Sequence, residues 1–538
     1  MNTKRLLALA GLPIVFAFGC AADLDPWTVE PRRVRVVESL DLPVASQEPT
    51  QNDRAATQPG DTPADTLQPE VELTLGRARE LALAGNLQLQ ISHLDPLIAR
   101  QQLTIEQAFF DTVFTVDASA ANIDTPTEVQ DVGSQIDSYS VTPGISQQIL
   151  PTGGNLIIDF PVNRTETNNP FATLNPSWET DGRLVFSQPL LRGFGADATE
   201  LGLRIATSQY GQSLAQQKLQ VTQILAAVDR AYWNLAATAR AVEVREQQVE
   251  LADDQLDRAG RMFKAGEVSE TEVVRAESGK ADAEEFLLQA RNFRRQAQRA
   301  LQVLLNDPQL PVGGPSRVIT ATQAVPLKYE VDADDLVVRA MDRRMELLAT
   351  ELRVLEQQAR IAAAENGLLP QLDFRYQHNL NGLGGDFGDG VDTAGSFDYQ
   401  DDIFGLTFSY PLGNRAARAR LKSSRLQRLR ELTTAESQML TIRQEVFDAV
   451  DALDTSWQRI IATRRRVDLA RRLLDAEVRQ FEQGLRTSTE VLEAQTNLAD
   501  AELSLIEALA DYEIGRTNLA EATGSVLGKS GVVLGNAE

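Results

Sequence analysis

The chain has 538 residues, and 43% of them are hydrophobic, which is enough to bury a sizeable core and too many for a disordered protein. Its 52 Lys and Arg against 76 Asp and Glu give a net charge of −24, so it lacks the basic surface that a nucleic-acid partner requires. One cysteine and two histidines exclude a disulfide scaffold and a Cys/His metal site and give no support to histidine-based catalysis. No phosphate-binding loop of the Gly-x-x-x-x-Gly-Lys-Ser/Thr type occurs, and no cofactor is expected.

The first 20 residues have the layout of a secretory signal peptide. Lys4 and Arg5 precede an apolar run, 6–18, that is too short to cross a bilayer as a helix. The run leads to Cys20 in a way that resembles the bacterial lipoprotein signal, which implies acylation of Cys20 as the new N-terminus. The alternative is an ordinary signal peptide cut after Ala22, with the cysteine discarded.

The next 50 residues and the six segments that follow them differ sharply in composition. Residues 21–70 are rich in Pro, Thr, Asp and Gln and lack an apolar period, which predicts a flexible tether. Six later segments are rich in Ala, Leu, Gln, Glu and Arg and nearly free of Pro, which predicts helices at 73–109, 196–260, 268–305, 333–366, 414–481 and 487–523. The two longest would each reach roughly 100 Å.

The long helices carry the seam of a coiled coil. Apolar residues recur in steps of mostly three and four at Val446, Val450, Leu453, Trp457, Ile460, Val467, Ala470 and Leu474, and again at Val491, Leu498, Leu505, Leu509, Tyr512 and Leu519. Each helix therefore has a face that needs a neighbouring helix.

Short segments between the helices have the two-residue period of β-strands. The candidates are 110–119, 139–149, 155–163, 183–189, 371–379 and 402–410, and several carry aromatic residues on one face. In an exported protein this pattern suits a barrel wall with lipid outside and water inside, and a soluble sandwich edge is the alternative. The Gly-rich stretch 382–390 is expected to be a surface loop rather than a calcium site.

The chain is an internal duplication. The segment from Phe263 to Ala276 returns from Phe481 to Ala494 at an offset of 218. Upstream, the offset is 222 at Gln188-Pro189-Leu190 and 258 in the helix before the first strands, so the first copy holds about 36 more residues between its strands. Each half alone has seams that it cannot bury.

The repeat order, the Gln188–Gly195 segment, the Gly484 turn and the closing Leu519–Gly524 segment resemble the TolC family of outer-membrane efflux proteins over residues 71–524. The resemblance implies a mainly α fold with a β-barrel portion, in which a homotrimer closes one transmembrane barrel that continues as a periplasmic coiled-coil tunnel. The corresponding domains are a first repeat at 71–305, an equatorial linker at 306–330, a second repeat at 331–524 and a tail at 525–538. The family pattern of four strands per chain leaves open whether the six candidates all lie in the wall.

The resemblance also implies a gate at the tunnel tip. It places Glu490 and Glu493 on acidic rings, Arg486 on a basic link, and Thr271 and Glu272 on its partners from the other hairpin, while Phe481 stands where tyrosine is usual. Glu490 and Glu493 share a helix face by their spacing, so threefold symmetry would gather six carboxylates and favour cations. The alternative is that both are ordinary solvated charges.

Two glycines mark the hairpin turns. Gly266 and Gly484 can serve simply to allow positive backbone angles. The resemblance further implies that the exposed tips, with Val268, Leu485 and Thr487, dock a periplasmic adaptor protein.

The function expected from these features is a passive exit duct in the outer membrane, extending into the periplasm and anchored by lipid at Cys20. It would complete a tripartite efflux or type I secretion system with a periplasmic adaptor and an inner-membrane transporter, and it would not be an enzyme. The alternative is an exported coiled-coil structural or adhesin-like protein without a pore.

Overall fold

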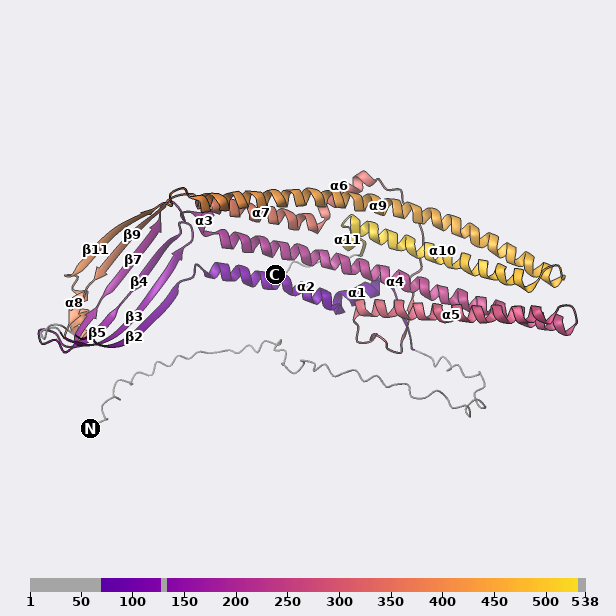
Figure 1. Cartoon of the computed structure of the whole chain (residues 1–538), viewed down its shortest axis with the longest axis horizontal. Helices are drawn as coiled ribbons and strands as arrows, with labels where there is room; N and C mark the ends of the chain where they lie inside the picture. The colour runs from indigo at the N-terminus through magenta and orange to yellow at the C-terminus, as the bar shows by residue number, and fades with distance from the viewer. Residues whose placement is uncertain (1–68, 127–132, 531–538) are drawn as a thin grey trace, which may run out of the picture. The chain divides into compact units, whose positions relative to one another are not determined.

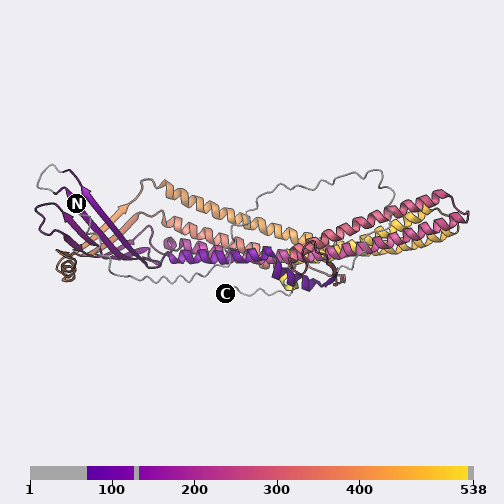
Figure 2. The ribbon, with the colours of Figure 1, turned by 90° about the horizontal axis from the view of Figure 1, so that it is seen from below.

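The computed structural model describes residues 69–126 and 133–530. The expected signal peptide, Cys20 and all but the last two residues of the expected tether lie outside the described residues. The described residues belong to one unit, in which the strands gather at one end and the turns of the long helices lie at the other (Figures 1 and 2). None of the helices within the described ranges is long and apolar enough to cross a membrane.

Two helices of the first half return in the second half with the same lengths and spacing. The first half has α1 (Leu75–Gly85) and α2 (Leu87–Ala108), and the second has α6 (Ala333–Arg343) and α7 (Met345–Asn366), each 258 positions later. The expectation of one unbroken helix in each half is therefore wrong. The first break has a clear cause, because the Asn86 side chain accepts hydrogen bonds from the N–H groups of Gln88 and Leu89 and so starts a new helix.

The long helices form two hairpins. The first pairs α4 (Leu201–Lys264), which follows the short α3 (Ala196–Thr199), with α5 (Glu270–Leu305). The second pairs α9 (Arg415–Glu482) with α10 (Ser488–Ala522). The predicted seam is confirmed, since α9 buries Val446, Leu453, Ile460, Val467 and Leu474.

The strands form one antiparallel sheet. Its members are β2 (Val113–Asp124), β3 (Gln135–Ile149), β4 (Gly154–Asp159), β5 (Val162–Thr167), β6 (Ser177–Thr180), β7 (Gly182–Pro189), β9 (Gln371–Leu380), β10 (Leu383–Gly384) and β11 (Gln400–Ser409). β4 and β5 lie end to end and both pair with the long β3. On their other side, β4 pairs with β7 and β5 pairs with β6. The sheet is therefore six strand positions wide, from β2 through β3, β4–β5, β6–β7 and β9 to β11.

All six strand candidates from the sequence lie in this sheet, so the extra pair of the first half belongs to it and not to an exposed loop. One expectation is wrong. The stretch 382–390 is not a plain surface loop, because it contains β10 and the start of α8 (Phe387–Gly395). The Asp386 side chain accepts a hydrogen bond from the Asp389 N–H and begins this helix.

A small second sheet lies beside the middle of the helices. Its strands β1 (Glu70–Leu73) and β8 (Arg317–Thr320) are parallel, and β8 falls inside the expected linker 306–330. The buried Tyr232 hydroxyl donates to the Leu73 carbonyl at 2.9 Å and accepts from the Thr322 N–H at 2.9 Å, which fixes this sheet to α4. In the expected tail, α11 (Val526–Ser530) buries Val526.

Candidate functional site

The two hairpin turns have the same backbone geometry. Gly266 and Gly484 adopt φ of 77° and 71°, which only glycine adopts without strain. The Gly266 N–H donates to the Phe263 carbonyl at 2.9 Å, and the Gly484 N–H donates to the Phe481 carbonyl at 2.9 Å. The following N–H in each turn reaches one residue further back, which completes the same helix-ending motif twice.

Two carboxylates meet at the start of α10. Glu490 accepts hydrogen bonds from the N–H of Thr487, at 2.9 Å, and from its hydroxyl. The Thr487 side chain in turn accepts from the Glu490 N–H, which completes a capping box. Glu272, from the other hairpin, accepts from the Ser488 N–H at 2.9 Å. This bond links the first hairpin to the second at the tip, and it is favourable because it places a negative charge at a helix N-terminus.

The two repeats differ in which helix their equivalent glutamates cap. Glu272 and Glu490 occupy equivalent positions in the duplication, yet Glu490 caps its own helix whereas Glu272 caps the helix of the other hairpin. Ser269, the equivalent of Thr487, forms no side-chain cap on α5. The start of α5 therefore has no side-chain cap, and its glutamate contacts the second hairpin.

Arg486 holds the second turn closed. Its Nε lies 3.2 Å from a Glu477 carboxylate oxygen and donates to the Gln480 side chain at 3.0 Å. Its Nη1 is 3.8 Å from Glu490. The hydrogen bonds from Thr487, with a smaller contribution from Arg486, lower the pKa of Glu490 below its usual 4.5.

Glu493 and Thr271 are exposed, as is Arg486. Glu493 forms no ion pair with any residue that the structure describes. It lines a cavity of about 520 Å³ between the hairpins together with Arg275, the residue equivalent to it in the first repeat. Arg275 itself pairs with Glu272 at 2.6 Å. Thr271 lies exposed on the first turn of α5.

Phe481 lies apart from this polar cluster. Its side chain is 1% exposed in the apolar core between α9 and α10, beside Val491 and Ala494. The ring therefore packs the hairpin rather than linking it to a neighbour. Its repeat equivalent, Phe263, is 44% exposed, and Leu485 at the second turn is 70% exposed.

Sequence reasoning missed several residues that join the two hairpins. The buried Gln255 side chain donates to the Ser488 hydroxyl at 3.4 Å, and Gln495 donates to the Leu251 carbonyl at 3.1 Å. Gly279 lets Leu492 approach so closely that an added Cβ would lie 2.7 Å from the leucine side chain. Such glutamines could have been found in the sequence, because a polar residue in an otherwise apolar coiled-coil seam often specifies which helices pair.

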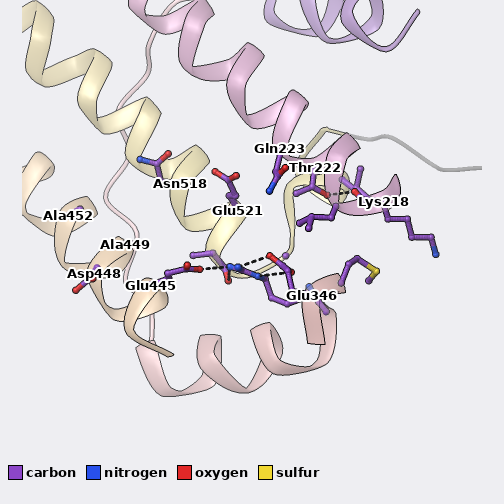
Figure 3. Close-up of a pocket in the computed structure, with 17 residues that line it drawn as sticks. Lys218, Thr222, Gln223, Glu346, Glu445, Asp448, Ala449, Ala452, Asn518 and Glu521 are labelled. Carbon is purple, nitrogen blue, oxygen red and sulfur yellow. Dashed lines mark hydrogen bonds and ion pairs between the residues drawn. The ribbon is translucent and has the colours of Figure 1, made fainter. Parts of the chain in front are cut away.

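A second cavity, of about 630 Å³, lies where α6 meets α7, between α4, α9 and α10. Glu346 and Glu445 point toward one another across it (Figure 3). Arg344 lies between them, 2.8 Å from each carboxylate, and also donates to the Ala522 carbonyl. These paired charges hold the helix break against α9 and α10. Across the described residues, no group of His, Cys, Asp and Glu is placed to hold a metal ion.

Several solved structures share this fold. The chain is 18% identical to the outer-membrane channel OprN, 15% to the Campylobacter jejuni CmeC outer membrane channel and 15% to the outer membrane protein VceC from Vibrio cholerae. Each comparison covers 84% of this chain and, in that order, 90%, 85% and 96% of the other, with TM-scores of 0.62, 0.63 and 0.62. Among curated proteins, none matches the chain.

The family model described as outer membrane efflux protein matches residues 163–307 and 336–525, more than half of the chain and both halves of the duplication. The match includes both hairpin turns and the residues around them. The protein belongs to the outer membrane efflux protein family, whose members are channels with the TolC fold.

Proposed function

We propose that three copies of this chain form the outer-membrane exit duct of a tripartite machine, in which an inner-membrane transporter supplies the energy and a periplasmic adaptor makes the connection. The observation that carries the proposal is the sheet, which has an apolar face and two open edges at one end of a unit whose other end holds two matching hairpin turns. Unpaired strand edges cannot remain in lipid, so each copy needs neighbours.

The hairpin tips are the proposed gate. Glu272 ties the first hairpin to the start of α10, and Arg486 ties the second turn to Glu477 and Glu490. Opening requires at least the first tie to break when the hairpins move apart. Glu490 is engaged by Thr487, whereas Glu493 is exposed, so Glu493 is the better candidate for a cation-attracting ring around a threefold axis.

The same tips are the proposed docking place for the adaptor. Gly266 and Gly484 shape the turns, and Thr487 is the N-cap of α10. Leu485 at the second turn is 70% exposed, and Val268 at the first turn is half-buried. An exposed leucine at a conformationally fixed turn offers apolar contact area to a helical partner.

The function is tested by mass and conductance together. Purified protein is expected to have the mass of a trimer in detergent and to conduct ions in planar bilayers, with reversal potentials that favour cations. Glu493→Ala should reduce this preference more than Glu490→Ala, whose partner is within the same chain. A coiled-coil adhesin without a pore would give no conductance, and unchanged selectivity in both variants would remove the acidic ring from the mechanism.

Adaptor docking needs a separate test. Leu485→Asp places a charge on the exposed tip without disturbing its backbone, and it should abolish cross-linking to the cognate adaptor while trimer mass and conductance stay unchanged. Leu473→Asp, also exposed on α9 but away from the turn, is the matched control. Equal cross-linking by both variants would contradict docking at the tip.

A further inference from the structure

We infer that each chain contributes six strand positions to the barrel wall, so that three copies close a barrel of about 18 strands, with β11 of one copy pairing with β2 of the next. The inference rests on the proposed trimer and deepens it, because it sets the width of the duct. The four strands per chain that the family resemblance implies would give about 12 strands.

The duplication identifies which strands are extra. β2 and β9 begin 258 positions apart, and the Pro189 that ends β7 aligns with Pro411, which follows β11, at 222. In the second half β9 pairs directly with β11, whereas in the first half β3 and β4–β5 stand between β2 and β7. The insertion is therefore one long β-hairpin within the sheet.

The inserted strands continue the apolar face of the wall. Directly paired residues point to the same side of a sheet, and one such row reads Phe114, Ile145, Ile158 and Leu184 across β2, β3, β4 and β7. The row ends in the polar His378 and Asp402, near the ends of β9 and β11. Phe114 and Ile145 are 67% and 47% exposed, so nothing else in the unit covers them. The same side carries Tyr376, Phe404, Leu406 and Phe408 on β9 and β11.

The opposite side is polar across all six positions. The adjacent row reads Thr115, Gly144, Asp159, Arg183, Asn379 and Asp401. Arg183 grips Asp159 with two hydrogen bonds, of 2.8 and 2.7 Å, which join the inserted β4 to β7 on this polar side. Large apolar exceptions there are Val113, Ile123, Ile136, Ile157, Val185 and Ile403. A sheet with lipid on one side and water on the other requires this division, and an exposed loop or a plug in the lumen does not.

The two edge strands of the sheet, β2 and β11, match in length and in the side on which most of their apolar residues lie. β2 has 12 residues and β11 has 10, which are the lengths that a tilted strand needs to cross a bilayer. Both strands are exposed along nearly their whole length. Phe114 and Val116 on β2 and Phe404, Leu406 and Phe408 on β11 lie on the apolar side of the sheet. A second copy of this chain therefore completes the hydrogen bonds of both edges without breaking the apolar face.

A wider wall has a direct consequence for cargo. Barrel diameter grows roughly in proportion to strand number, so 18 strands give a lumen about 1.5 times as wide as 12. The barrel end of the duct would then pass folded peptides or bulky solutes that a 12-stranded wall excludes.

Spin labels at single cysteines test the wall in liposomes, with wild type, whose only cysteine is Cys20, as the background control. Labels at Ile145→Cys and Ile158→Cys should collide mainly with oxygen dissolved in lipid, and a label at Ser146→Cys with an aqueous nickel complex. Phe408→Cys and Thr407→Cys on β11 provide the matched pair. Water exposure at all three inserted positions, with normal alternation on β11, would overturn the inference and leave the channel intact.

Deletion of residues 133–168 tests the width. The variant removes the inserted hairpin and should still be a conducting trimer, but polyethylene glycols added from the outer side should be excluded at a diameter about 1.5-fold smaller. An unchanged exclusion size in a conducting trimer would overturn the inference. If the deletion variant does not assemble, the spin labels decide alone. Loss of trimer mass and conductance in wild type would instead refute the proposed function.

Discussion

The Ser488 N–H donates a hydrogen bond of 2.9 Å to the carboxylate of Glu272, 216 positions earlier in the chain. This bond joins the turn of one repeat to the turn of the other. Because Ser488 is the first residue of α10, the bond also places a negative charge at a helix N-terminus, where it is favourable. Together with the hydrogen bond from Gln255 to the Ser488 hydroxyl, it has to break if the first hairpin moves away from the second.

Removal of this carboxylate should loosen the tip. Glu272→Ala leaves the Ser488 N–H without its charged partner, which costs roughly 1.5 to 3 kcal/mol for a charge-assisted hydrogen bond. We expect higher single-channel conductance or more frequent opening. Glu270→Ala, an exposed glutamate in the same turn, is the control. Equal conductance in Glu272→Ala and wild type would show that this bond does not restrain the proposed gate.

The two equivalent phenylalanines should differ in their effect on stability. Phe481→Ala empties a site that is 1% exposed and should lower the free energy of unfolding by about 3 to 5 kcal/mol. Phe263→Ala removes a ring that is 44% exposed and should cost less than about 1 kcal/mol. The temperature at which the oligomer dissociates on a gel gives the comparison. Similar temperatures for the two variants would contradict the packing described for Phe481.

Acid should weaken the hairpin tip only at a pH below the ordinary pKa of a glutamate. The pKa of Glu490 in the folded protein lies below 4.5, so the stabilisation from its bonds to Thr487 is complete above pH 4.5 and is lost as the pH falls through the lower value. The temperature at which the proposed trimer dissociates on a gel should therefore stay constant down to about pH 4.5 and fall below it. Glu490→Gln should abolish this acid response. A wild-type response centred near pH 6 would point to another group.

Charges on the two sides of β11 should have opposite consequences. Leu406→Lys places a charge on the apolar side and should destabilise the membrane-inserted protein by about 2 to 4 kcal/mol if the residue lies near the bilayer centre. Thr407→Lys, one residue later, points to the polar side and should leave insertion unchanged. Unfolding by urea in liposomes measures both. Equal destabilisation would contradict the assignment of the two sides.

Much of the fold could be predicted because its signals are periodic and repeated. The seam of α9 and α10, the six strand candidates and the two turns all follow from the spacing of apolar residues and from Gly266 and Gly484. The break at Asn86 was missed because helix propensity and apolar period continue across it, and only the side-chain cap interrupts the helix.

The contacts of the site could be predicted only in part. The duplication aligns Glu272 with Glu490 and suggests equivalent roles, but which helix each glutamate caps depends on how the hairpins pack. Burial of Phe481 and exposure of Phe263 likewise depend on which faces of two similar hairpins meet. Sequence periodicity identifies a face but not its neighbour.

The account depends most on the claim that several copies enclose one aqueous passage. Electron cryomicroscopy of the purified protein in lipid nanodiscs measures this directly. We expect a threefold-symmetric particle with a single barrel, in which β2 and β11 of neighbouring copies are paired and the hairpin tips converge on the axis. A monomer whose own sheet closes on itself, or a trimer with three separate lumens, would contradict it.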